Sequence, residues 1–192
     1  MDILIVGDSW AADFTVKYKD QKGWSNMLAN KYQVTNKAQA GVGQYKILKQ
    51  LESVPIHAFD VVISSFTTPY RVNTIEHPVH SQDVLHGHCD LLAADCEAHL
   101  ANDKNNIGLQ SAMGYFEYHF DLDYYETVHD LLIDKCYRVI GDTVHLEIGK
   151  LDYNGKTFYE VTQSYKGTMN HMSEDGNTLI VDTIESALTN LT

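Results

Sequence analysis

Positive charge is scarce in this sequence. It holds 14 lysines and arginines against 26 aspartates and glutamates, which gives a formal net charge of −12. Binding to a nucleic-acid backbone depends on cationic side chains that displace counterions from the phosphates. Anionic membrane surfaces attract basic segments in the same way. The charge balance therefore argues against nucleic acid and against a membrane surface as partners.

Cysteines and long apolar runs are also scarce. The three cysteines, Cys89, Cys96 and Cys136, show no paired-motif spacing and are expected to be free thiols, as in a reducing cytoplasm. No apolar run approaches the roughly 20 residues that a membrane-spanning helix needs. The first residues lack a basic segment followed by a long apolar one, so no signal peptide is expected. These features favour a cytoplasmic location.

Apolar runs alternate with segments of helical spacing along most of the chain. Its 192 residues suit one domain with a single core, so we expect one domain over residues 1–192. Residues 3–6, 33–36, 60–66 and 143–148 are predicted strands, and helices are expected before 33, around 47–51, over 126–139 and after Ser173. This order predicts a three-layer α/β sandwich with a mainly parallel sheet of about four or five strands.

Residues 77–125 depart from this alternation. Helical spacing over residues 83–100 is interrupted at 102–106, and an aromatic-rich acidic segment follows. We expect an insertion that covers the sheet edge near Ser9 and shapes a pocket there. Its aromatic side chains could stack against a sugar or acyl group, or pack the insertion onto the sheet. Farther on, Asn154-Gly155 predicts a type I′ turn in a β-hairpin.

Three loops follow predicted strands, at residues 7–9, 41–43 and 67–69. Open α/β sheets bind ligands at such loops, beyond the carboxyl ends of the strands. The first loop ends in Ser9, and a serine exposed on a sharp turn is a candidate nucleophile if a base lies nearby. Gly-Asp-Ser is also typical of a plain turn with a helix cap, because Asp and Ser both cap well. Both interpretations stay open at this point.

Three segments carry a resemblance to a known family. "IVGDSW" is similar to the first block of the SGNH (GDSL-type) hydrolases, "NKAQAGVG" to their second, and "HMSEDGNTLIVDTIESAL" to their last. The segments stand in the family's order and frame nearly the whole chain. The opening also resembles that of short proteins of tailed phages that begin with a similar Gly-Asp-Ser-Trp. The resemblance implies an SGNH/flavodoxin-like fold and a serine ester hydrolase.

The resemblance also implies roles for individual residues. Ser9 would be the nucleophile and His171 the general base, whose ordinary pKa near 6.5 suits neutral pH. Backbone N–H groups of Ser9 and Gly41 would stabilise the oxyanion, helped by the N-terminus of a helix after Ser9.

Two positions depart from the family's pattern. Thr68 stands nearest to the usual oxyanion-binding asparagine, and Thr168 stands where an aspartate usually precedes the histidine. A Ser-His dyad or incomplete triad is therefore expected. Thr68 could donate through its hydroxyl or be structural, and Arg71 could replace it or form a surface ion pair. Asp8, Trp10 and Arg71 are expected to contact the substrate.

The first functional hypothesis is a serine esterase that hydrolyses an acyl ester, such as an O-acetyl group, on a carbohydrate or small molecule. Alternatives are a catalytically silent SGNH-like binding module or phage structural module, and an acyltransferase on the same site. The sequence does not specify an oligomeric state.

Histidines and cysteines crowd one stretch and raise the question of a metal. They are His77, His80, His86, His88, Cys89, Cys96 and His99. Cys89 and Cys96 would lie about 10.5 Å apart on a continuous helix, too far to share one ion. Cys96 and His99 could share one, but they supply only two ligands. No four-ligand spacing appears, so neither a metal nor another cofactor is expected.

Overall fold

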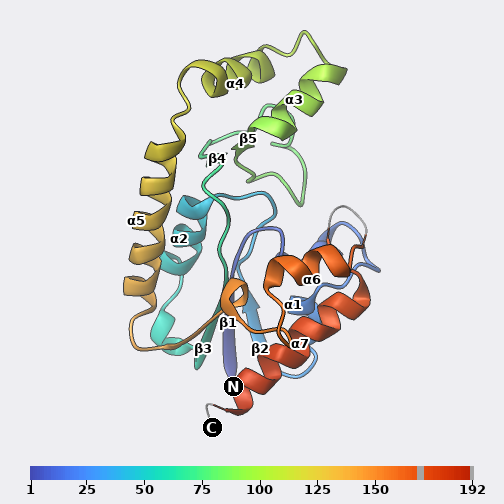
Figure 1. The fold of residues 1–192 in the computed structure, drawn as a ribbon, viewed down its shortest axis with the longest axis vertical. Coiled ribbons are helices and arrows are strands. Elements are labelled where there is room, and N and C mark those ends of the chain that lie inside the picture. Colours follow the sequence, from blue (N-terminus) through green and yellow to red (C-terminus); the bar gives the residue numbers. More distant parts are fainter. Residues whose placement is uncertain (168–170, 191–192) are drawn as a thin grey trace.

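The computed structural model describes residues 1–167 and 171–190. A four-stranded parallel sheet forms its centre, in the order β2-β1-β3-β6 (Figure 1). The strands are β1 (Asp2–Gly7), β2 (Gln33–Asn36), β3 (Val61–Ser65) and β6 (Val144–Glu147). The expected parallel sheet is confirmed, including the pairing of Ile3 with Val61. The order reverses between β1 and β3, which is where doubly wound sheets bind ligands.

Helices cover both faces of the sheet. The helices α1 (Trp24–Leu28) and α7 (Glu174–Thr189) lie on one side, and α2 (Gln44–Glu52) and α5 (Leu122–Ile140) on the other (Figure 1). Successive strand residues point to opposite faces, so Ile3 and Ile5 join the core with α1 and α7, whereas Leu4 and Val6 join the core with α2 and α5. The three-layer α/β sandwich is therefore confirmed.

The remaining elements outside the insertion are short. They are the 3-10 turns η1 (Phe14–Val16), η2 (Ile56–Ala58) and η3 (Ile148–Lys150), and the helix α6 (Phe158–Ser164). Within residues 1–167 and 171–190, no helix combines the length and apolar character that crossing a membrane requires.

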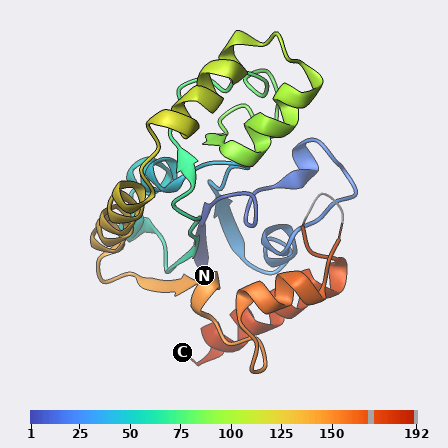
Figure 2. The same cartoon turned by 45° about the horizontal axis from the view of Figure 1, so that its top comes forward.

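The insertion lies beyond the carboxyl ends of the strands (Figures 1 and 2). It contains β5 (Leu91–Leu92), which pairs antiparallel with β4 (Arg71–Val72) just before the insertion, and then α3 (Ala93–Asn102) and α4 (Ile107–Tyr118). A small separate core of Cys96, Leu109 and Ala112 holds α3 against α4. The insertion thus stands over the end of the sheet that carries Ser9.

Helical spacing over residues 83–100 does not form one helix. The helix α3 begins only at Ala93. Upstream of it, the Asp83 carboxylate accepts the N–H groups of Leu85 and His86 and forms an ion pair with Lys17. These local bonds offer the backbone an alternative to helix. Residues 77–90 therefore fold back toward α3 as turns.

The predicted hairpin at residues 151–161 is also wrong, although its turn is present. Asn154 and Gly155 both have positive φ, of 57° and 80°. The segment after the turn is the helix α6, because Thr157 and Glu160 form a capping box at its start. A Thr-x-x-Glu pattern was thus the signal for a helix in the sequence.

Candidate active site

The loop after β1 is built around Gly7. Its φ is +152°, and a Cβ on it would lie 2.6 Å from the Ser65 Cβ of the neighbouring strand. The buried Gln50 side chain of α2 bonds both backbone groups of Gly7, accepting from N–H at 2.8 Å and donating to the carbonyl at 3.0 Å. Only glycine fits here, and the chain leaves the sheet in a fixed direction.

Asp8 closes this loop into a single turn. Its carboxylate accepts the Trp10 N–H at 3.0 Å and the Ser65 hydroxyl at 3.2 Å, and its carbonyl accepts the N–H groups of Ala11 and Ala12 at 3.1 Å each. Burial raises the pKa of Asp8, against the opposing effects of the Trp10 N–H and the charge of Arg71. Asp8 is thus a structural group of the turn.

The helix expected directly after Ser9 is absent from this described loop. Because Asp8 satisfies the following N–H groups within one turn, helical backbone begins only at Phe14, in the three-residue turn η1. The prediction of a helix N-terminus beside Ser9 is therefore wrong. The Ser9 N–H itself makes no hydrogen bond to any described residue, so it is available to a ligand.

Gly41 offers a second N–H of this kind. Its φ is +77°, and a Cβ on it would lie 2.5 Å from the Cβ of Cys89. Its carbonyl accepts the Asp90 N–H at 2.9 Å and the Arg71 Nη1 at 3.0 Å. These bonds fix the peptide plane, while the Gly41 N–H has no hydrogen-bond partner in the described part of the chain. The predicted oxyanion donor is thus free to act as one.

His171 precedes α7 and lies among aromatic rings. Its ring centroid is 4.3 Å from that of Phe14 and 5.2 Å from that of Trp10. Its carbonyl accepts the Gly167 N–H at 2.6 Å. Burial, with a smaller effect of His86, lowers the pKa of His171 to about 4. Among the described residues no carboxylate lies within 4.0 Å of its ring nitrogens, and Thr168 falls outside those residues.

Ser9, Trp10 and His171 line two cavities together. One, of about 360 Å³, extends between the loop after β1 and the start of α7. The other, of about 310 Å³, extends toward the insertion and is also lined by Gly41 and Arg71. The fold therefore gathers five of the predicted site residues, and the insertion forms one wall of their pocket.

Two predicted site residues lie apart from this group. Thr68 lines a smaller cavity of about 80 Å³, whose walls include Gly43 and His129. Neither Thr68 nor Asp8 is among the described residues that line the two cavities at Ser9. The roles of Thr68 in oxyanion binding and of Asp8 in substrate binding stay predictions.

Sequence reasoning missed Asp90, whose side chain is fully buried. It bonds the Lys46 ammonium at 2.6 Å and accepts the N–H groups of Gly43 at 2.6 Å and Thr74 at 3.0 Å. A buried carboxylate needs such partners. It ties the insertion to the loop that holds Gly41. No motif identifies it, because its partners come from two other segments of the chain, the start of α2 and the residues after β4.

A second serine-histidine pair lies in the sheet itself. The Ser64 hydroxyl is 2.8 Å from Nε2 of His145 on the adjacent strand β6. Ser64 is fully buried within β3, so its hydroxyl cannot meet a substrate. Burial lowers the pKa of His145. This pair is a structural bond between β3 and β6.

No family model matches the sequence, and no curated protein is significantly similar to it. Among solved structures, the chain is similar to a protein described as lipolytic, of the G-D-S-L family, from Desulfitobacterium hafniense, with 10% identity and a TM-score of 0.40 over 96% of this chain and 98% of that one. It is also similar to TesA, with 13% identity and a TM-score of 0.44 over 100% of both chains. A third structure, described as an acylhydrolase from Bacteroides fragilis, has 10% identity and a TM-score of 0.42 over 99% of this chain and 87% of that one. Matches this distant do not assign a family.

Proposed function

We propose that this protein is a serine ester hydrolase of the SGNH type, with Ser9 as nucleophile and His171 as base. The observation that carries the proposal is that both residues line the same two cavities. The N–H groups of Ser9 and Gly41, two residues that line the cavity of about 310 Å³, have no partner among the described residues. A nucleophile, a base and two oxyanion donors are the parts that acyl transfer requires.

In the proposed reaction, His171 takes the proton of the Ser9 hydroxyl as the oxygen attacks the ester carbon. The N–H groups of Ser9 and Gly41 stabilise the oxyanion. His171 then gives its proton to the departing alcohol, which leaves an acyl group on Ser9. A water molecule repeats the sequence and releases the acid. Because burial lowers the pKa of His171 to about 4, the ring is neutral at pH 7 but is a weak base, so slow turnover is expected.

The proposed substrate is an acyl ester, such as an O-acetyl or other short acyl group, on a small molecule or carbohydrate. Cavities of about 360 and 310 Å³ fit ligands of this size. We further propose that the protein acts in the cytoplasm, because all three cysteines, which lie in the described part of the chain, are free thiols.

One observation favours the alternative of a silent SGNH-like binding module, including a structural module of a phage particle. No described carboxylate contacts His171 to orient its ring. A site that lacks only this carboxylate partner of His171 would still bind an ester or carbohydrate without hydrolysing it.

Turnover of a series of p-nitrophenyl esters, from acetate to longer acyl chains, separates the two proposals. Ser9→Ala and His171→Ala should each lower turnover by at least about 10³-fold, and the double variant should lose little more, because members of one catalytic unit are strongly non-additive. Ser186→Ala and His57→Ala, at exposed positions away from both cavities, are the matched controls. Folded wild-type protein whose turnover of every ester in the series is no higher than that of Ser9→Ala and His171→Ala would support the silent module.

A further inference from the structure

The insertion gathers titratable side chains that the proposed esterase mechanism does not use. Nε2 of His80 lies 3.4 Å from the Asp95 carboxylate, and Nε2 of His99 lies 3.7 Å from it. One ligand atom from each of these three residues lies within 4.8 Å of the other two. Asp95 and His99 are four residues apart on α3, which places them on one face of the helix. The arrangement leaves room for one ion between them.

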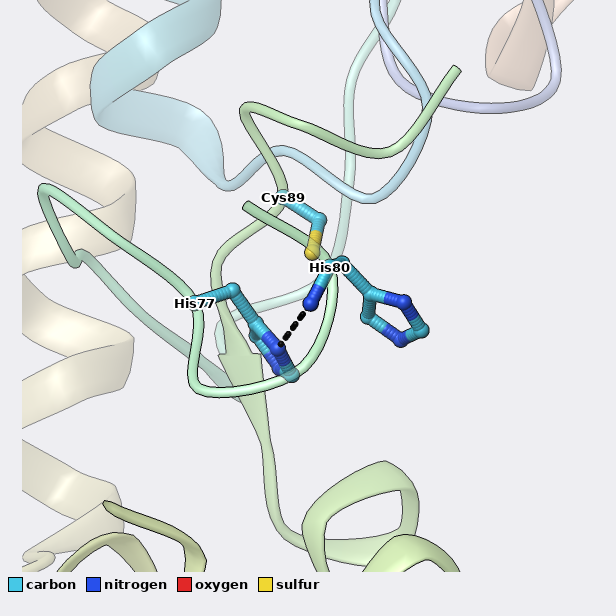
Figure 3. A group of neighbouring side chains, drawn as sticks. All are labelled: His77, His80 and Cys89. Carbon is cyan, nitrogen blue, oxygen red and sulfur yellow. Dashed lines mark hydrogen bonds between the residues drawn. The ribbon is translucent and has the colours of Figure 1, made fainter. Parts of the chain in front are cut away.

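His77 contacts this group but is held by the backbone. Its side chain is fully buried, and its Nδ1 accepts the N–H groups of Val79 at 3.2 Å and His80 at 3.3 Å (Figure 3). A neutral ring that accepts at Nδ1 carries its proton on Nε2. That Nε2 makes no hydrogen bond with any described residue, yet lies 3.4 Å from the Asp95 carboxylate. A buried unsatisfied donor is costly, and this one is aimed at the group where the ion would be held.

We propose that His80, Asp95 and His99 bind a divalent transition-metal ion, best matched by zinc, and that His77 positions the Asp95 carboxylate. Two imidazoles and one carboxylate form the three-ligand set of open zinc sites, and the same set holds Fe²⁺ in non-haem iron enzymes. The same set is a poor match for Mg²⁺ or Ca²⁺, which prefer oxygen ligands. Carboxylates that bind a metal are in turn hydrogen-bonded by neighbouring groups, which is the role proposed for His77.

The proposed metal site adjoins the pocket of the proposed esterase. His80 and Asp95 line the cavity of about 310 Å³ that is also lined by Ser9 and His171. The metal proposal nevertheless stands on its own ligands and does not require that Ser9 be reactive. It reverses the expectation from the sequence, which found no four-ligand spacing among these histidines and cysteines and expected no metal.

Cys89 is the competing ligand. Its Sγ lies within 4.8 Å of the ligand atoms of His77 and His80, and Figure 3 shows the three side chains together. Binding by that set would require His77 to give up the bonds that its Nδ1 accepts from the N–H groups of Val79 and His80. This cost favours the set of His80, Asp95 and His99.

Calorimetric titration of chelator-treated protein with Zn²⁺ tests the proposal. The wild-type protein should bind one equivalent of Zn²⁺ per chain and should not bind Mg²⁺ comparably. His99→Gln, a change at a partly exposed position, should weaken zinc binding by at least about 100-fold. His77→Gln should weaken it about 10–100-fold with the stoichiometry unchanged, whereas partial unfolding would lower the stoichiometry instead. His119→Gln, at an exposed position in the same insertion, is the matched control.

Replacement of zinc by Co²⁺ identifies the ligands directly. The proposal predicts a visible spectrum without a thiolate-to-cobalt charge-transfer band, unchanged by Cys89→Ser. The proposal would be overturned by a thiolate-to-cobalt charge-transfer band or by the absence of metal binding in the folded wild-type protein. An equal loss of zinc affinity in His99→Gln and His119→Gln would also overturn it.

Discussion

Asp8 and Ser9 are adjacent in the chain but meet opposite surroundings. Asp8 is buried beneath the turn and bonds the Trp10 N–H and the Ser65 hydroxyl, whereas Ser9 lines both cavities. The two interpretations of Gly-Asp-Ser from the sequence therefore describe different residues of one motif. Asp8 closes the turn, and this closure presents Ser9. At the residue scale, the proposed chemistry depends on His171, whose surroundings are apolar.

The pH profile should report this apolar setting. Because the pKa of His171 is lowered to about 4 and the base must be neutral, kcat/KM should hold as pH falls through 6.5 and decline only near pH 4. The folded pKa lies below the unfolded one, so stability should also fall between pH 6.5 and 4, and His171→Gln should remove part of that loss. Initial rates of ester hydrolysis from pH 3.5 to 8 provide the measurement. An acid limb near pH 6.5 would contradict the buried setting described for the ring.

At the scale of elements, sequence patterns predicted the helices and strands for which the local backbone preference and the packing in the folded protein favour the same structure. Both β1 and β3 contain an unbroken apolar run, at residues 3–6 and 61–63, and α7 has a Ser173 cap ahead of its buried stripe. Patterns failed where local bonds override periodicity, as at Asp83. They also failed where a capping box follows a hairpin-like turn, as at Thr157. Ser9, Gly41 and His171 could be found because their loops stand at strand and helix ends.

Partners that come from several loops could not be found in this way. Asp90 and the group around Asp95 depend on how the insertion folds back over the sheet, and no spacing along the chain encodes that path.

The loop after β2 should tolerate no side chain at Gly41. A Cβ there would lie 2.5 Å from Cys89, and its φ of +77° is strained for alanine. Gly41→Ala should lower the free energy of unfolding by about 1–3 kcal/mol and reduce ester turnover through the displaced N–H. Gly114→Ala, inside α4 with nothing within 4 Å of an added Cβ, is the matched control and should be neutral or stabilising. Equal effects of the two changes in urea unfolding would refute this account of the loop.

For the whole molecule, the doubly wound order places three loops around one crevice. The strands β1 and β3 are neighbours, and the strand order reverses between them. The loops after β1 and β2 and the insertion after β3 therefore meet at the same end of the sheet. The sheet itself is held by two apolar cores, one on each face. The site depends on this sheet for its geometry.

Stability should therefore follow burial in these cores. Ile63 of β3 is fully buried, and Ile63→Ala should lower the free energy of unfolding by about 2–5 kcal/mol. Ile75 is 99% exposed, and Ile75→Ala, the same chemical change, should alter it by less than about 0.5 kcal/mol. Chemical denaturation followed by circular dichroism compares the two. A similar loss from both would contradict the described position of β3.

The central claim, that Ser9 is an activated nucleophile, is tested most directly by a serine-reactive fluorophosphonate and peptide mapping by mass spectrometry. The account predicts one adduct per chain, located on Ser9, absent from Ser9→Ala and much slower to form in His171→Ala. Ser186→Ala should label like the wild-type protein. Failure of the folded wild-type protein to form an adduct, or an adduct on another serine that persists in Ser9→Ala, would contradict the claim.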